Sequence, residues 1–344
     1  MYSFKNDYSE GAHPQILNAL IETNMVQEEG YGEDRYSLQA AELLKEKMGR
    51  SDVAIHFLTG GTQTNLTAIS AFLRPHHAAI AAITGHINVH ETGAIEATGH
   101  KVLTVNSGKD GKLTPAGIQA VLDAHPDEHM VKPKLVYISD TTENGAVYTK
   151  NEVEQLSTFC KENHLYFYMD GARLGSALTS SANDLELSDL PNLVDAFYVG
   201  GTKNGALLGE ALVICNDELK EDFRFYMKQK GAMLAKGRLT GIQFLELFRD
   251  NLFFDLAAHA NAMATKISEG IDAAGYGFLT PPVSNQIFPI LPNTLLEELH
   301  QQFNFFDWEK VDDEHTAVRL VTSWATKEEA VDAFVESLKK KVTE

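Results

Sequence analysis

The segment Leu165–Arg173 has the sequence "LYFYMDGAR". Its first five residues are apolar or aromatic, and an acid, Asp170, and a glycine, Gly171, follow them directly. An uninterrupted apolar run is typical of a strand covered on both faces, as the strands of parallel sheets are. The segment therefore predicts a central strand of a parallel sheet, in an α/β fold, with a carboxylate at its end.

Strand and helix patterns alternate around this segment. Six further runs rich in Val, Ile, Phe and Tyr are strand candidates: Val53–Leu58, Ala79–Ile83, Val102–Val105, Leu135–Ser139, Ala196–Val199 and Ala211–Ile214. Helical patterns lie between them at Thr64–Leu73, Thr114–Ala124 and Asn151–Asn163, and Thr114 and Pro115 suit an N-cap and a first helical position. This alternation predicts βαβ units and a mostly parallel sheet flanked by helices.

The pattern changes after about Gly241. We expect one long amphipathic helix over Phe244–Ala273, strands within Gly277–Leu291 and Ala317–Trp324, and a closing helix over Lys327–Lys341. The sequence thus predicts an N-terminal arm and a large α/β domain over residues 1–243, and a smaller C-terminal α+β domain over residues 244–344. Both sizes lie in the usual range for domains.

Composition narrows the partners and the compartment. With 48 acidic and 29 basic residues, the net charge of −19 argues against nucleic acid and anionic membrane surfaces as partners. The chain shows no apolar stretch long enough for a membrane span and no signal peptide at its start. Cys160 and Cys215 lie in apolar runs, which favours buried thiols over a disulfide. We expect a cytoplasmic protein.

The carboxyl ends of the predicted strands carry polar residues. "TGGTQTN", "TGHINVHE", "DTTENG", "DGAR" and "GGTKNG" each follow a strand candidate. In parallel α/β sheets such ends share one rim, where ligands bind. The glycines of "TGGTQTN" lead into a helix and suit a phosphate group, although a plain strand-to-helix turn explains them about as well. The dinucleotide pattern G-x-G-x-x-G is absent.

Three ionisable residues at this rim suggest chemistry. Asp170 can hold a protonated ring nitrogen, and Lys203, alone in a glycine-rich loop between apolar runs, can form a Schiff base with an aldehyde. His86 can stack on an aromatic ring or act as a general base, but with His90 it lacks the third ligand of a metal site. Each has an ordinary alternative: a carboxylate paired with Arg173 at a helix cap, a solvated lysine, a structural histidine.

Taken together, these features fit pyridoxal phosphate. This cofactor needs a lysine for its aldehyde, a carboxylate for its ring nitrogen, a phosphate cradle and a partner for the ring face. The chain presents the cradle, the histidine, the aspartate and the lysine in that order. We therefore predict pyridoxal 5'-phosphate as the cofactor, and no metal.

Several motifs in order carry a family resemblance. They are "NDYSEGAHP" near the start, "YGED" at Tyr31–Asp34, "TGGTQTNL" at Thr59–Leu66, "GHINVHETG" at Gly85–Gly93, "ENG" at Glu143–Gly145, "DGAR", "TKNG" at Thr202–Gly205 and "VRLVTSW" at Val318–Trp324. In these motifs the sequence resembles the L-threonine aldolases. They belong to the β-eliminating lyase superfamily and to the aspartate-aminotransferase-like class (fold type I) of pyridoxal-phosphate enzymes.

The resemblance implies roles for individual residues. Lys203 would form the Schiff base, Asp170 would pair with the pyridine nitrogen, and His86 would stack on the ring. The residues implied for phosphate are Gly61, Thr62 and Thr202, and those implied for the substrate's carboxylate are Arg173, Arg319 and Asn6. Family members form sites between subunits, so a homodimer or homotetramer is implied, in which the Tyr31–Asp34 loop reaches a neighbour.

The implied reaction is a retro-aldol cleavage of a β-hydroxy-α-amino acid, L-threonine or L-allo-threonine, to glycine and an aldehyde. Two departures keep the substrate open: Glu143 replaces a family histidine that bears on the β-hydroxyl, and the family's loop arginine has only Lys230, Lys236 or Arg238 as a match. The alternatives are β-elimination from another β-substituted amino acid, a non-catalytic pyridoxal-phosphate-binding protein, and a nucleotide-binding protein without a Schiff base.

Overall fold

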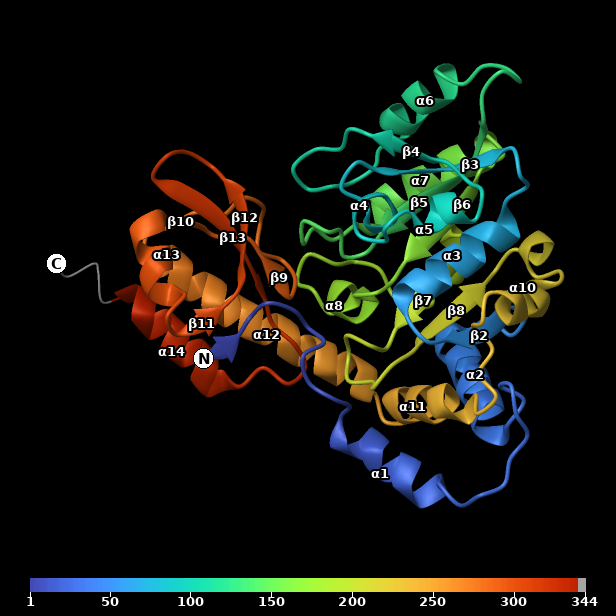
Figure 1. Ribbon diagram of the computed structural model, residues 1–344, viewed down its shortest axis with the longest axis horizontal. Helices are drawn as coiled ribbons and strands as arrows, with labels where there is room; N and C mark the ends of the chain where they lie inside the picture. Colours follow the sequence, from blue (N-terminus) through green and yellow to red (C-terminus); the bar gives the residue numbers. More distant parts are fainter. Residues whose placement is uncertain (340–344) are drawn as a thin grey trace.

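A seven-stranded sheet forms the centre of the molecule. The computed structural model describes residues 1–339, and its large sheet has the strand order β2–β8–β7–β6–β5–β3–β4 (Figure 1). The strands are β2 (Ala54–Leu58), β3 (His77–Ala82), β4 (Val102–Val105), β5 (Lys132–Ser139), β6 (Tyr166–Asp170), β7 (Ala196–Gly200) and β8 (Glu210–Ile214). β8 is antiparallel to β2 and β7, and the other neighbours are parallel. The predicted mostly parallel sheet and its seven strands are confirmed.

Helices cover both faces of this sheet. The helices that precede the C-terminal layer are α1 (Pro14–Thr23), α2 (Arg35–Met48), α3 (Gly61–Phe72), α4 (His86–Val89), α5 (Ala94–Ala97), α6 (Pro115–Asp123), α7 (Lys150–Glu162), α8 (Leu174–Leu178), α9 (Leu190–Leu193), α10 (Phe223–Gln229), α11 (Arg238–Arg249) and α12 (Leu252–Ala273), with a 3₁₀ turn, η1 (Asp217–Leu219). As predicted, Thr114 caps α6, by accepting a hydrogen bond from the N–H of Gly117. Thr149 and Glu152 form a capping box at α7.

The alternation of buried side chains explains the uninterrupted apolar strands. In β6, Phe167 and Met169 pack into a core shared with α2, α7 and α11, whereas Tyr168 points into a second core shared with α3, α5 and α10. Tyr198 of β7 joins that second core. Both sheet faces are therefore buried, as the sequence of β6 predicts.

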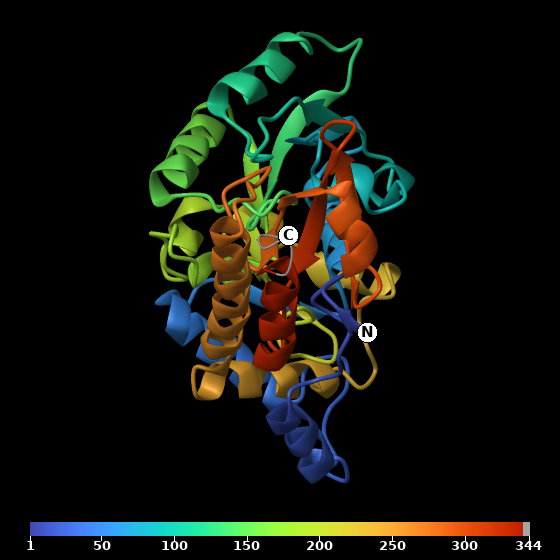
Figure 2. The same cartoon turned by 90° about the vertical axis from the view of Figure 1, so that its left-hand side faces the viewer.

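The C-terminal part forms a smaller sheet of its own. Its elements are β9 (Gln286–Ile287), β10 (Ile290–Pro292), α13 (Asn293–Leu299), β11 (Phe303–Asn304), β12 (Phe306–Lys310), β13 (His315–Val321) and α14 (Glu328–Lys339). β13 pairs antiparallel with β9, β10 and β12, and α14 packs beside α12 (Figure 2). The closing helix is confirmed as far as Lys339, and its predicted last two residues lie outside the described part of the chain.

The first residues of the chain belong to this C-terminal layer. β1 (Tyr2–Ser3) pairs in parallel with β11, and Phe4 is fully buried in the same core as α14. Figure 1 shows the N-terminus beside β11 and α14. The chain then crosses to α1, which packs against α11, so residues 5–13 run between the two layers.

The prediction of a single helix over Phe244–Ala273 is wrong. α11 ends at Arg249 and α12 begins at Leu252, because Asn251 adopts a left-handed conformation with φ of 66°. Asparagine tolerates that conformation better than most residues, so the apolar periodicity continues through a break in the backbone. The predicted boundary between residues 243 and 244 falls inside α11, which packs against α2, and this boundary stays a prediction.

Both cysteines are buried free thiols, as predicted. Within residues 1–339, no helix combines the length and apolar character that crossing a bilayer requires.

Candidate active site

Asp170, the last residue of β6, is buried and accepts four hydrogen bonds. The donors are Tyr198 Oη at 2.5 Å and the Ala172 N–H at 3.0 Å to Oδ1, and Tyr137 Oη at 2.6 Å and Asn65 Nδ2 at 2.9 Å to Oδ2. Burial alone would raise the pKa of Asp170, but the charge of His86 and these hydrogen bonds outweigh it, so the pKa lies below its usual value. The carboxylate therefore stays ionised and can face a cationic ring nitrogen.

His86 lies beside this aspartate, at the start of α4. Its Nδ1 is 2.8 Å from Oε1 of Glu91, a buried carboxyl that also accepts a hydrogen bond of 2.7 Å from Nδ2 of Asn65. Asn65 thus bridges Glu91 and Asp170. The Glu91 contact orients the imidazole ring, as a carboxylate behind a functional histidine commonly does.

Lys203 lies in the loop between β7 and β8 and is partly buried. Burial and the positive charge of Arg173 lower the pKa of Lys203, while the negative charges of Asp7, Asp170 and Glu210 partly restore it. Within residues 1–339, nothing bonds or pairs with its Nζ atom. The amine is therefore unengaged, partly desolvated and within electrostatic range of Asp170, which is what a Schiff-base lysine requires.

The N-terminus of α3 suits an anion. Its N-cap is Gly60, and no side chain caps the helix, so the N–H groups of its first turn, including Gly61 and Thr62, are not paired by a cap. A Cβ atom on Gly61 would lie 3.0 Å from Tyr198 Oη, so the glycine keeps this turn close to the aspartate site. The hydroxyl of Thr202 donates to Oε1 of Glu210 at 2.8 Å and accepts from the Gly209 N–H at 3.0 Å.

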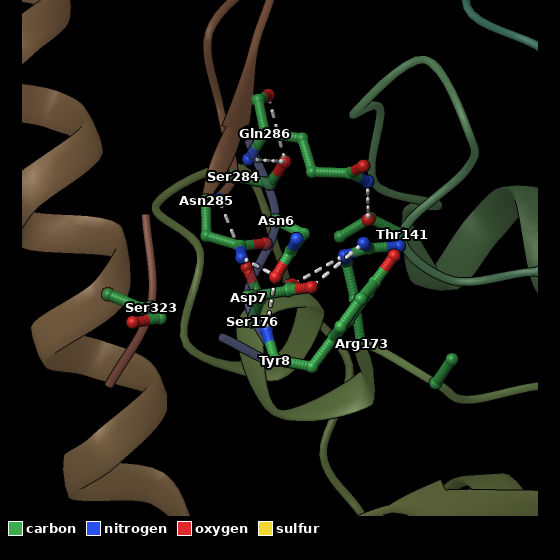
Figure 3. Close-up of polar contacts among 12 residues, drawn as sticks. Asn6, Asp7, Tyr8, Thr141, Arg173, Ser176, Ser284, Asn285, Gln286 and Ser323 are labelled. Atoms are coloured by element: carbon green, nitrogen blue, oxygen red, sulfur yellow. Dashed lines mark hydrogen bonds and ion pairs between the residues drawn. The ribbon is translucent and has the colours of Figure 1, made fainter. Parts of the chain in front are cut away.

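Arg173 is held by an acid that the sequence prediction did not include. Its Nε and Nη2 atoms donate to Oδ2 and Oδ1 of buried Asp7 at 2.7 and 3.0 Å, and Nδ2 of Asn285 also donates to Oδ2, at 2.9 Å. Figure 3 shows Asp7 between Arg173 and Asn285. The side-chain oxygen of Asn6, which is predicted to assist with the substrate's carboxylate, accepts a hydrogen bond from the Tyr8 N–H at 3.0 Å. This bond closes the turn beside Asp7.

Arg319 approaches the same region from β13. Its Nε and Nη2 atoms donate to Oε1 of Gln286 at 3.2 and 2.5 Å. Burial and the positive charge of Arg173 lower the pKa of Arg319 to about 10. Because the charge of Arg173 disfavours the protonated form of Arg319, an anion between the two arginines is favoured, and a substrate carboxylate is such an anion.

Glu143 lies between the histidine and the arginines. Its Oε1 accepts from the backbone N–H of His86 at 2.9 Å and from Ser139 Oγ at 2.7 Å. Burial and the negative charge of Asp170 raise the pKa of Glu143, although the Ser139 bond and the charge of His86 oppose the shift. This carboxyl group can therefore exchange a proton nearer neutral pH than an ordinary glutamate.

Two predicted loops also have defined contacts. Arg238 donates to the carbonyl oxygens of Asn24 and Val26, so it holds the chain after α1. In the Tyr31–Asp34 loop, Asp34 caps α2 through the Ser37 N–H at 2.8 Å, while Tyr31 is 45% exposed.

Sequence reasoning missed several residues of this network. Three had a signal: Asp7 follows Asn6 in "NDYS", Glu91 follows His90, and Glu210 is an acid at the head of an apolar strand. Tyr137 and Tyr198 gave none, because tyrosine in an apolar strand is indistinguishable from ordinary core until its hydroxyl partner is known.

The comparisons with known proteins agree with this geometry. A model of the family described as "Beta-eliminating lyase" matches residues 7–292. The low specificity L-threonine aldolase of Pseudomonas sp. is 33% identical over 333 residues, which are 95% of this chain and 94% of that protein. The chain is a member of the threonine aldolase branch of the β-eliminating lyases.

Solved structures support the same family assignment. The Leishmania major threonine aldolase is 53% identical, with a TM-score of 0.98 and coverage of 99% of this chain and 100% of that one. A Thermus thermophilus aspartate aminotransferase mutant, at 15% identity, has a TM-score of 0.72 over 99% of this chain and 91% of that one. The predicted aspartate-aminotransferase-like fold, fold type I, is confirmed.

β-Eliminating lyases of fold type I depend on pyridoxal phosphate, and the residues of this chain fit the cofactor. The unengaged amine of Lys203, the ionised Asp170 and the uncapped start of α3 provide for its aldehyde, its ring nitrogen and its phosphate. This β-eliminating lyase is therefore a pyridoxal-phosphate-dependent enzyme.

Proposed function

We propose that this enzyme is a carbon–carbon lyase that cleaves a β-hydroxy-α-amino acid, L-threonine or L-allo-threonine, to glycine and an aldehyde. The observation that carries the proposal is that the Lys203 amine and the Asp170 carboxylate lie close enough for their charges to interact. Two arginines, Arg173 and Arg319, lie beside them. The similarity to threonine aldolases over nearly the full chain supports the reaction class.

The cofactor, when bound, supplies an aldehyde that condenses with amines and an electron-poor ring that withdraws electrons from Cα. Asp170 keeps a negative charge where the ring nitrogen would lie, and its four donors prevent the carboxylate from turning away. Lys203 provides the amine, and His86, oriented by Glu91, provides the flat partner for the ring. Gly61 and Thr62 are the proposed phosphate ligands.

Arg173 and Arg319 are the proposed carboxylate ligands. Asp7 occupies the Nε side of Arg173, and Gln286 occupies the Nε side of Arg319. The two Nη1 groups, which bond no other group in the part of the chain that the structure describes, therefore point in fixed directions. A carboxylate held at two points fixes rotation about the adjacent carbon. The two arginines would thereby hold the Cα–Cβ bond of the amino acid in a single orientation in the site.

Glu143 is the proposed partner of the β-hydroxyl. One of its oxygens is bonded to Ser139 and to the His86 N–H, and the other has no hydrogen-bond partner within residues 1–339. A carboxyl group with a raised pKa can accept the hydroxyl proton during cleavage and return it afterwards. Its length and charge would also decide between the two configurations at Cβ.

Two measurements test the proposal. The purified protein with cofactor should absorb as a Schiff base, the band should shift when glycine or threonine is added, and Lys203→Ala should abolish it. Product analysis should find glycine and an aldehyde. Ammonia and a keto acid would instead establish β-elimination, and a band without turnover of any amino acid would indicate a non-catalytic binding protein.

We also propose that copies of this chain associate. On α1 and just beyond it, Leu17, Ile21 and Met25 are 41%, 73% and 88% exposed at a spacing of four residues, which forms one apolar stripe. The exposed Tyr31 continues the same segment, so the Tyr31–Asp34 loop would contribute to a neighbour's site. Replacing Ile21 by Glu should then reduce the particle mass in light scattering.

The two buried, unpaired thiols support a cytoplasmic location.

A further inference from the structure

Glu210 is a buried acid directly behind the lysine loop. It is the first residue of β8, it is 4% exposed, and its backbone pairs with Leu58 of β2 and Gly200 of β7. Two groups of the loop bond its carboxyl: the Gly201 N–H donates to Oε2 at 3.0 Å, and Thr202 Oγ1 donates to Oε1 at 2.8 Å. The carboxyl thus anchors both residues that precede Lys203.

Three carboxyl groups exert their charge on Lys203, and Glu210 differs from the other two. Asp7 is paired with Arg173, and Asp170 has four donors, so both have pKa values below the usual range. Burial raises the pKa of Glu210 to about 7, and the bond from Thr202 and the charge of Lys203 oppose the rise only in part. Glu210 is therefore the carboxyl of the three that changes charge near neutral pH.

We infer that Glu210 is a positioning residue that fixes the Gly201–Lys203 loop and sets how firmly Lys203 holds its proton. An ionised Glu210 stabilises the charged form of Lys203, whereas a neutral Glu210 does not. The other groups that face the pair keep their charge over this range: Asp7 and Asp170 remain negative, Arg173 remains positive, and Tyr168 and Tyr198 remain neutral. Within residues 1–339, His90, whose pKa is lowered by burial, is a further titratable group that the charge of Lys203 affects.

The direction of the effect follows from the charges. Glutamine in place of Glu210 removes the negative charge and keeps one oxygen, which can accept from the Gly201 N–H. Its amide nitrogen can donate to the Thr202 hydroxyl, which then turns from donor to acceptor. The nitrogen of Lys203 should then lose its proton at lower pH, by about 0.5–1 pH unit, which corresponds to a roughly 3- to 10-fold weaker hold on the proton.

The test titrates the cofactor-loaded, full-length protein by absorbance, without amino acid. The midpoint of the band should move to lower pH in Glu210→Gln. The midpoint should stay in place in the matched control Glu246→Gln. Glu246, on α11, is also buried, but its carboxyl bonds Arg249 at 2.8 Å and Gln15 at 3.1 Å rather than the loop of Lys203. A Glu210→Gln midpoint equal to that of the wild type overturns the inference.

Two further measurements keep the test decisive. If Glu210→Gln does not fold, Thr202→Val removes the hydroxyl that holds Glu210 and should shift the midpoint in the same direction, while Thr202→Ser should restore it. Amine-selective labelling of Lys203 in the cofactor-free protein should be 3- to 10-fold faster in Glu210→Gln near pH 7.5. Equal labelling rates and equal midpoints would both contradict the inference.

The absorbance assay rests on the proposed function, since it assumes that Lys203 carries the cofactor. The two ideas fail differently. A band that survives Lys203→Ala refutes the proposed function, whereas a band that Lys203→Ala removes but Glu210→Gln leaves unshifted refutes only the role of Glu210.

Discussion

Asp7 and Arg173 form a two-point ion pair, with Nε–Oδ2 at 2.7 Å and Nη2–Oδ1 at 3.0 Å, across 166 positions of sequence. Asp7 is 1% exposed, and Asn285 of the C-terminal layer also donates a hydrogen bond to its Oδ2. A planar guanidinium held along one edge presents its other edge in a fixed direction. The pair therefore orients the arginine and joins three distant segments of the chain.

Replacing Asp7 by Asn should destabilise the protein and weaken amino-acid binding. It leaves a buried guanidinium without a counter-charge, a loss of about 3–5 kcal/mol in the free energy of unfolding. Urea unfolding measures the loss. Asp52→Asn is the control, because its Arg50 pair is exposed, and it should leave the unfolding midpoint unchanged. Equal midpoints for the two variants would contradict the buried pair.

Replacing Arg319 by Gln should raise the KM for the amino acid by roughly 10- to 100-fold, since charge-assisted hydrogen bonds contribute about 1.5–3 kcal/mol each. The KM of Arg319→Lys should lie between those of the wild type and Arg319→Gln, because lysine keeps the charge but loses the planar fork. Steady-state kinetics would check the order. A KM that is unchanged in both variants would show that β13 does not contact the substrate.

Stability should fall with rising pH because of Asp140, which follows β5. This carboxyl is 2% exposed and has one weak bond, from the Tyr148 N–H at 3.3 Å. Burial raises its pKa from 3.8 to about 7. Between these values the folded state holds a proton that the unfolded state releases, so stability declines as pH rises through this window and stays lower above it.

Asp140→Asn should remove that penalty. The variant should be more stable than the wild type by ~1–3 kcal/mol at pH 8 and closer to it at pH 5, as measured by urea unfolding at both values. A gain that is equal at the two pH values would assign the effect to packing rather than to ionisation.

Gly171→Ala should disrupt the aspartate site. A Cβ atom there would lie 1.9 Å from the carbonyl oxygen of Tyr198, so β7, which carries a donor to Asp170, must move. We expect the free energy of unfolding to fall by more than ~3 kcal/mol and cofactor binding to weaken. Thermal unfolding measures the first effect, and cofactor titration measures the second. Gly11→Ala, which meets no atom within 4 Å, should be neutral.

The sequence predicts elements well where local patterns decide them. The apolar run of β6 identified its strand because both faces are buried, and Thr114 marked the start of α6 because capping is local chemistry. The break at Asn251 was missed, because a left-handed residue leaves the apolar periodicity on both sides unchanged.

The sequence predicted where the proposed reacting groups lie, but it did not predict the residues that support them. Lys203, Asp170 and His86 lie at strand ends, where topology alone brings them together. Asp7, Gln286 and Asn65 act through contacts between segments far apart in the chain, and no spacing in the sequence encodes such contacts.

The pairing of β1 with β11 joins residues 2–3 to residues 303–304, far later in the sequence, in one structural unit. During synthesis, the large sheet can form once β8 has left the ribosome, but Tyr2, Phe4 and Asp7 must wait for partners near residues 285–304. The contacts that hold Asp7, which orients Arg173, are thus completed only after residue 285 has been synthesised. A nascent chain stalled before residue 285 would contain Lys203 and Asp170, but its Arg173 would not yet be oriented to bind an amino acid.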